Sequence, residues 1–260
     1  MTPDARPGPV SRSRRRRGTY AGRVPTDDPG LAPALALGPT TPWEAARDLL
    51  VDHGWALAGT GDGAWVWRSP SRRHAARISP FDPAAPYTAA LYEAAAGTGR
   101  VPRDARLVPL DGGASLLVME HLDPVPAGVA ADFHRRLGGG DPELAALAAH
   151  VGAVHARAAA EQPFWGPVDA NPGNVMRRDD GTLVLTDPFY ADGPALYRTA
   201  AEDPDRFVAL VPAARRRHLA DIPLAASGPW KPGAQERLRR ALDDADLRSR
   251  AATEGTARGT

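Results

Sequence analysis

The chain has 260 residues, of which 43% are hydrophobic, enough for one large globular domain or two small ones. Its 32 basic and 31 acidic residues leave a net charge of +1, which argues against a protein devoted to nucleic-acid binding. The absence of cysteine excludes disulfides, zinc–thiolate sites and thiol catalysis, and a cytoplasmic location is expected. No apolar run of about twenty residues occurs, so no membrane span is predicted.

Residues 1–40 are rich in proline and glycine, contain the basic run SRSRRRRG and lack apolar periodicity, so a disordered tail is predicted. The arginine run is interpreted as solvated, and contact with an anionic partner is the alternative. At the other end, residues 248–260 are expected to be frayed.

Residues 41–122 are predicted to form a strand-rich unit. It opens with a helix over 42–54, in which Trp43, Ala46, Leu50 and Val51 lie near helical spacing. A second helix is predicted over 86–97, ending at Gly97. Strands are predicted for the remaining periodic segments: two around the glycine-rich turn in 55–68, and one each in 74–79, 105–110 and 114–122.

Residues 123–247 are predicted to be mostly helical, after a break at GGGD in 138–141. A long helix from Pro142 carries one apolar stripe, made of Leu144, Leu147, Val151, Val154 and Ala158. A short hairpin follows, and then three helices: 194–202, 205–219 and 233–246. This order predicts an α+β fold with two lobes, a strand-rich N-lobe and a shortened, mostly helical C-lobe.

The stretch VDANPGNVMRRDDGTLVLTDPF, residues 168–189, contains an acid, an asparagine five residues later and a second acid thirteen residues after that. Its NPG sequence favours a turn, so a hairpin is expected to bring Asn174 and Asp187 within coordination distance of one hard cation. Asp169, on the same loop, is then placed to take a proton from an attacking hydroxyl. A plain β-hairpin with surface acids is the alternative.

This stretch resembles the catalytic loop and metal-binding turn of the protein-kinase-like superfamily, in which D-x-x-x-x-N precedes D-F-G. The form DANPGN is closer to aminoglycoside and choline phosphotransferases than to ordinary protein kinases. The resemblance implies that Asp169 is the catalytic base and that Asn174 and Asp187 are magnesium ligands. The chain differs from the family at Pro167, where a histidine is usual, and in having DPF in place of DFG.

Two glycine-rich or apolar segments, GTGDG and LLVMEHL, resemble the nucleotide-binding part of the same family. GTGDG is similar to its glycine-rich loop, with Gly59, Gly61 and Gly63 approaching phosphates, although a hairpin turn would look the same. LLVMEHL is similar to its hinge, where the backbone after Met119, at Glu120 and His121, would pair with adenine; core packing is the alternative for Met119.

Arg77, in HAARIS, stands where the family has a lysine that holds phosphates and pairs with a helix glutamate. Glu93 is the expected partner, although an exposed helix glutamate would look the same. The resemblance thus implies an ATP- and magnesium-dependent phosphotransferase that acts on a hydroxyl of an unknown acceptor, a small molecule or a protein. A pseudokinase is the alternative, favoured by Arg77 and Pro167, and a nucleic-acid partner is disfavoured apart from possible contacts of the tail.

Overall fold

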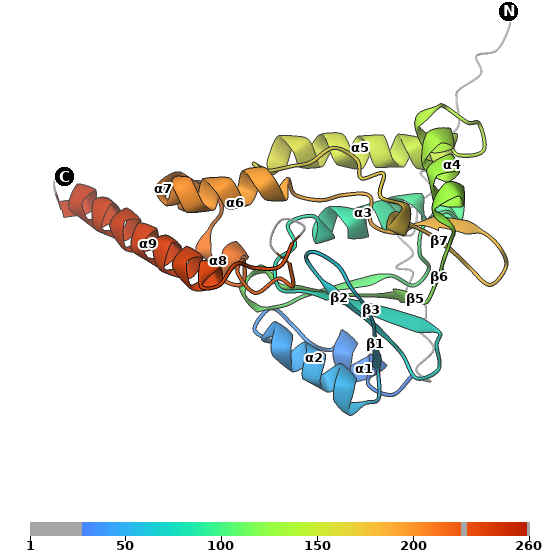
Figure 1. Ribbon diagram of the computed structural model, residues 1–260, viewed down its shortest axis with the longest axis horizontal. Helices are drawn as coiled ribbons and strands as arrows, with labels where there is room; N and C mark the ends of the chain where they lie inside the picture. The colour runs from blue at the N-terminus through green and yellow to red at the C-terminus, as the bar shows by residue number, and fades with distance from the viewer. Residues whose placement is uncertain (1–27, 225–227, 259–260) are drawn as a thin grey trace, which may run out of the picture.

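The structure, a computed structural model, describes residues 28–224 and 228–258. The part of the predicted tail in residues 1–27 lies outside the described residues. Figure 1 shows a mixed α+β fold in which helices lie on both sides of a five-stranded sheet. In the described ranges, no helix combines the length and apolar composition needed to cross a membrane.

The five-stranded sheet is antiparallel, in the order β1-β2-β3-β5-β4. Its strands are β1 (Ala56–Thr60), β2 (Trp65–Arg68), β3 (His74–Ser79), β4 (Arg106–Pro109) and β5 (Ser115–Glu120). Because side chains alternate along a strand, β3 and β5 supply two separate cores. Ala76 and Ile78 pack on the outer face, whereas Ala75, Leu117 and Met119 pack on the inner face.

The outer face is covered by α1 (Leu31–Leu35) and α2 (Trp43–Asp52). The predicted tail is therefore wrong for residues 28–40, because Leu31 and Ala34 are fully buried against this face. The Asp28 carboxylate also accepts hydrogen bonds from Ser71 N and Oγ at 3.1 and 2.7 Å and contacts His74 Nδ1 at 2.6 Å. Helix α1, with five residues, is too short for an apolar periodicity to be recognised in the sequence. On α2, the Val51 side chain is 47% exposed, so it does not share the buried face of Trp43, Ala46 and Leu50 as their spacing had predicted.

The inner face is covered by α3 (Ala85–Ala95), which packs in turn against α5 (Ala145–Glu161). Tyr87 of α3 donates its hydroxyl to Glu161 at 2.7 Å. A further helix, α4 (Ala127–Gly138), was not predicted; Ala130 and Phe133 join the same core. One continuous core therefore runs from the inner face of the sheet through α3 to α5.

A three-stranded sheet, β6-β7-β8, lies beside this core. The remaining elements are β6 (Asp123–Pro124), β7 (Val175–Arg177), β8 (Leu183–Leu185), α6 (Gly193–Glu202), α7 (Pro204–Leu210), α8 (Ala213–Arg216), α9 (Ala234–Arg258) and the 3₁₀ turns η1 (Ala96–Thr98), η2 (Asp111–Gly113) and η3 (Pro172–Asn174). Two predictions are wrong here. The helix expected over 205–219 is split around Pro212, and the end expected to be frayed remains helical to Arg258.

Candidate active site

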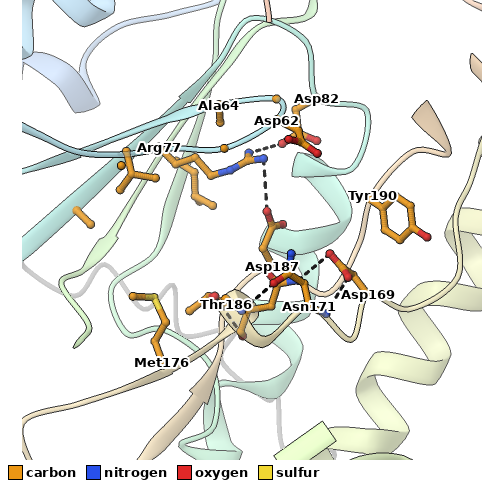
Figure 2. A pocket seen from close by; sticks show the side chains of 18 of the residues that line it. Asp62, Ala64, Arg77, Asp82, Asp169, Asn171, Met176, Thr186, Asp187 and Tyr190 are labelled. Carbon is orange, nitrogen blue, oxygen red and sulfur yellow. Dashed lines mark hydrogen bonds and ion pairs between the residues drawn. The ribbon is translucent and has the colours of Figure 1, made fainter. Parts of the chain in front are cut away.

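A cleft of about 980 Å³ lies between the inner face of the five-stranded sheet and the β7–β8 hairpin (Figure 2). Ten of the eleven predicted site residues line it: Gly59, Gly61, Gly63, Arg77, Met119, Glu120, His121, Asp169, Asn174 and Asp187. Glu93 does not; it is exposed on the far side of α3. Residues more than 100 positions apart in the sequence thus meet at one cavity.

The loop before β7 is organised by the Asp169 carboxylate. Its Oδ1 accepts the backbone N–H of Asn171 at 2.9 Å, and its Oδ2 accepts the side-chain amide of Asn174 at 2.8 Å. Asn171 in turn accepts the N–H of Gly173 at 2.8 Å, which fixes the turn that NPG predicts. Each oxygen of Asp169 keeps a lone pair for another donor, since an ionised carboxylate has about four acceptor sites.

Backbone hydrogen bonds fix Asp187 on both sides. Thr186 N donates to Asn174 O at 2.8 Å, and Asp169 N donates to Pro188 O at 2.9 Å. The three predicted residues are therefore brought together by pairing between the loop and the end of β8. Enclosure in the cleft raises the pKa of Asp187 to about 6, with Arg77 opposing this shift and Asp82 and Asp169 adding to it.

The oxygens of Asn174 and Asp187 fit a magnesium ion in their chemistry. The Asn174 amide nitrogen is used by Asp169, while its Oδ1 receives no hydrogen bond from the described residues. Amide and carboxylate oxygens are the hard ligands that magnesium takes. No group of three or more His, Cys, Asp or Glu within the described ranges forms a metal site, so phosphate and water would have to complete the coordination.

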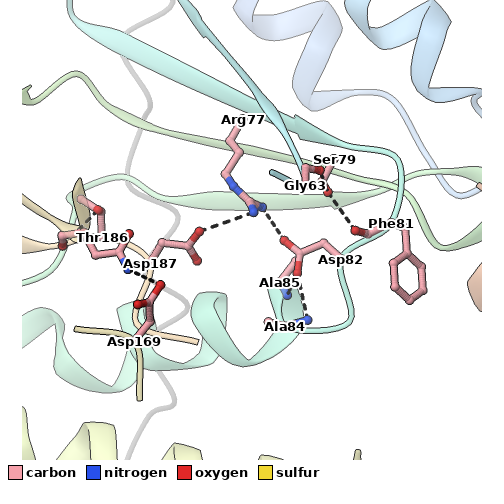
Figure 3. A network of polar contacts seen from close by, with 11 residues as sticks. Gly63, Arg77, Ser79, Phe81, Asp82, Ala84, Ala85, Asp169, Thr186 and Asp187 are labelled. Carbon is pink, nitrogen blue, oxygen red and sulfur yellow. Dashed lines mark hydrogen bonds and ion pairs between the residues drawn. The ribbon is translucent and has the colours of Figure 1, made fainter. Parts of the chain in front are cut away.

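Arg77 pairs with Asp82 and Asp187, not with Glu93 (Figure 3). Its guanidinium hydrogen-bonds Asp82 and lies 3.4 Å from Asp187. Burial alone would lower the pKa of Arg77, but Asp187 and Asp82 raise it, so the side chain is a permanent cation. The expected partner is wrong because α3 turns the neighbouring Tyr92 towards the cleft, and Glu93 therefore faces solvent.

Asp82 is a site residue that the sequence interpretation missed. Its Oδ1 accepts the backbone N–H groups of Ala84 and Ala85 at 2.9 and 3.0 Å, which caps the start of α3. The signal was present in FDPAAP, since Asp next to Pro before a helix is typical of an N-terminus. One oxygen therefore fixes the helix, while the other holds Arg77.

The glycine-rich turn between β1 and β2 forms the edge of the cleft nearest to Arg77. None of Gly59, Gly61 and Gly63 has a positive φ. A Cβ at Gly59 would meet no protein atom within 4 Å, and one at Gly61 would meet only Ala64 O at 3.8 Å. Neither backbone strain nor protein packing in the described structure therefore requires glycine at Gly59 or Gly61.

The predicted hinge lines the cleft, but its backbone is partly used by the protein. The N–H of Glu120 donates to Arg103 O at 3.2 Å, and that of His121 donates to Arg73 O at 2.7 Å. The Glu120 carboxylate accepts from Arg178 at 2.8 Å. Pairing with a ligand at these two residues would therefore have to use their carbonyl oxygens. Met119 is buried in the inner core, so it packs there as well as lining the cleft.

Two histidines contact the loop through its backbone carbonyl groups. His155 Nε2 lies 3.2 Å from Gly166 O, and His134 Nε2 lies 3.2 Å from Asn171 O. His155 lies on α5 and His134 on α4, so each of these helices contacts the loop. Tyr190, also missed, closes the far end of the cleft beside Asp169 and packs over Gly166. No pattern in the sequence singles it out.

No protein-family model matches the chain, and no curated protein matches it. The solved structures that are similar to it include a pseudokinase and a choline kinase. A pseudokinase in its apo form has 12% identity and a TM-score of 0.28, over 72% of this chain and 82% of its own. The choline kinase LicA from Streptococcus pneumoniae has 11% identity and a TM-score of 0.26, over 76% of this chain and 85% of its own. TM-scores this low do not establish a shared fold, so the function has to be argued from the cleft.

Proposed function

We propose that the chain is a two-lobed, protein-kinase-like phosphotransferase that uses ATP and magnesium to phosphorylate a hydroxyl group. The observation that carries the proposal is the meeting of Asp169, Asn174, Asp187 and Arg77 at one cleft edged by a glycine-rich turn. Phosphoryl transfer needs hard oxygen ligands for the metal, a carboxylate that can accept a further proton and a cation that binds phosphate.

The transfer assigns one task to each side chain. The acceptor hydroxyl donates a hydrogen bond to Asp169, its oxygen attacks the γ-phosphorus, and the proton passes to the carboxylate as the bond to the ADP oxygen breaks. Asn174 and Asp187 would hold magnesium, which supplies positive charge to the phosphates. Arg77 binds phosphate oxygens as a fork, a geometry that suits phosphate.

The glycine-rich turn supports phosphate binding on grounds separate from the motif. Its glycines are not needed for folding at Gly59 and Gly61, so the missing side chains leave room for a ligand to approach the backbone. Backbone N–H groups in such a turn bind phosphate oxygens. The adenine ring would then lie along Met119 and donate its amino group to a carbonyl oxygen of the hinge.

A nucleotide-binding pseudokinase is the second candidate, and one contact favours it. Arg77 lies 3.4 Å from Asp187, so the cation faces a proposed magnesium ligand. If this ion pair persisted with nucleotide bound, Asp187 would be unable to hold the metal and transfer would fail. The two candidates therefore differ in whether ATP separates Arg77 from Asp187.

Two measurements test the proposal. Thermal unfolding is followed with ATP, with and without millimolar magnesium, and labelled ATP is then supplied to the protein alone and with a panel of alcohols. Stabilisation and transfer together are the expected result. Stabilisation without transfer to any acceptor would favour the pseudokinase, and no shift with any nucleotide would overturn the assignment of the cleft.

A further inference from the structure

A second cavity, of about 540 Å³, lies behind the cleft. It is bounded by the start of α3, the η2 turn between β4 and β5, the end of α5 and the α7–α8 connection. Its size is within the range of small-molecule sites, which is about 300–1,000 Å³. None of the residues predicted from the sequence as site residues lines it.

The walls of this cavity are mainly apolar and aromatic. They include Phe81, Tyr87, Leu107, Phe164, Trp165 and Val211. The η2 turn closes one side tightly, since a Cβ at Gly113 would lie 2.3 Å from the Arg215 carbonyl oxygen. These walls, which the fold holds in place, would suit the apolar part of a ligand.

The polar groups at the wall lack acceptors. Each of the three acids that line the cavity already accepts a hydrogen bond: Asp82 from Arg77, Asp111 from Arg217, and Glu161 from the Tyr87 hydroxyl. By contrast, Trp165 Nε1 and Ser115 Oγ are buried without a hydrogen-bond partner among the described residues. The Arg215 side chain, at the mouth, forms no ion pair within the described part of the chain. Trp165 Nε1, Ser115 Oγ and the Arg215 guanidinium can each donate, so an acceptor group on a ligand would suit them.

The second cavity shares a wall with the cleft. Phe81, Asp82 and Pro83 line both, together with Ala191 and Leu196. Figure 3 shows the Asp82 carboxylate facing Arg77 and the Phe81 ring turned away from it. A molecule that fills the second cavity therefore presses on the short segment whose carboxylate positions Arg77.

We propose that this cavity binds a small apolar molecule carrying one anionic group, and that its occupancy alters the position of Asp82 and thereby regulates the cleft. The binding part is independent of the proposed function, whereas the effect on ATP rests on it. By linkage, the ligand must change ATP affinity by the same factor as ATP changes ligand affinity.

The test uses 8-anilino-1-naphthalenesulfonate, an aromatic anion, in fluorescence titrations of the full chain. Ala213 and Ala214 are both exposed on α8, but only Ala214 lines the cavity. Ala214→Trp should fill the mouth and weaken binding about tenfold or more, while Ala213→Trp should change it less than about twofold. Arg215→Gln should weaken binding of the sulfonate about threefold and leave that of the neutral N-phenyl-1-naphthylamine unchanged.

Equal losses in Ala213→Trp and Ala214→Trp, or no saturable binding to the folded chain, would overturn the proposal. A rise in melting temperature with the probe distinguishes binding to the native state from binding to unfolded protein. A further titration with saturating magnesium and ATP measures the coupling. If ATP does not bind at all, the assignment of the cleft fails, and the two tryptophan variants still decide the second cavity.

Discussion

The two walls of the cleft are held together in different ways. Within the loop wall, from Asp169 to Asp187, the side chains of the motif are positioned mainly by short-range hydrogen bonds, such as Asn174 to Asp169 and Thr186 to Asn174. The sheet wall depends on distant parts of the chain: Arg77 reaches Asp187, and Leu224 N donates to Asp62 O at 3.1 Å. A local network is encoded in a short motif, whereas a distant one is decided by packing.

The largest effect is expected within the loop wall. Asp169→Asn keeps the shape of the side chain but removes the proposed proton acceptor, so turnover should fall by about a hundredfold or more while ATP binding stays near wild type. Single-turnover rates and binding constants would be compared with those of Asp179→Asn, an exposed acid in the β7–β8 turn. Equal turnover in wild type and Asp169→Asn would show that the local network does not serve catalysis.

The second prediction concerns the layer behind the sheet wall. Leu31→Ala removes a fully buried side chain from α1 and should lower the free energy of unfolding by about 3 kcal/mol. Urea denaturation would measure this loss, with Pro33→Ala in the exposed part of the same helix as control. A loss no greater than that of the control would mean that α1 does not stabilise the sheet.

The third prediction separates the walls from each other. Asp187→Ala removes both a proposed magnesium ligand and the contact that joins the walls through Arg77. ATP at 100 times its dissociation constant should stabilise the wild type by about 2.7 kcal/mol, and the magnesium-dependent part of this stabilisation should disappear in the variant. Thermal unfolding at fixed ATP, with and without magnesium, measures it, and an unchanged magnesium effect would place the metal elsewhere.

The fourth prediction compares Asp82, which pairs with Arg77, with Glu93, which was expected to. Asp82→Asn keeps an acceptor for the start of α3 but loses the charge, so ATP affinity should fall about tenfold and stability by about 1–2 kcal/mol. Glu93→Gln, on the exposed side of α3, should change either quantity very little. The reverse result would restore Glu93 as the partner of Arg77.

The smallest effect is a pH dependence at the joint between η2 and the segment after α8. The hydrogen bond with Asp221 raises the pKa of His218, despite partial burial. Its contribution to stability is therefore full below the unfolded value of about 6.5 and is lost as pH rises through the raised pKa. His218→Gln should be less stable than wild type at pH 5.5 and equal to it at pH 9, in urea titrations at both. A constant difference would exclude protonation as the cause.

The sequence was most informative where the contacts are local. The β-strands on either side of the glycine-rich turn, the helix over α5 and the grouping of Asp169, Asn174 and Asp187 all follow from short-range patterns. The partner of Arg77 did not, because a rotation of about 100° per residue along α3 decides whether Tyr92 or Glu93 faces the cleft. Helix α1 escaped prediction because five residues are too few for a periodicity to be recognised.

The close fit of η2 against α8 has a consequence for how the cleft opens. Gly113 lies against the backbone of Arg215, and α3, which covers the inner face of the sheet, packs along α5. A rigid-body hinge of the sheet would have to break both contacts at once. Ligand entry is therefore expected to depend on local movement of the glycine-rich turn, which backbone contacts such as the hydrogen bond from Leu224 N to Asp62 O join to the rest of the chain. In hydrogen-exchange experiments, the amides of this turn should exchange well before those of β3 and β5.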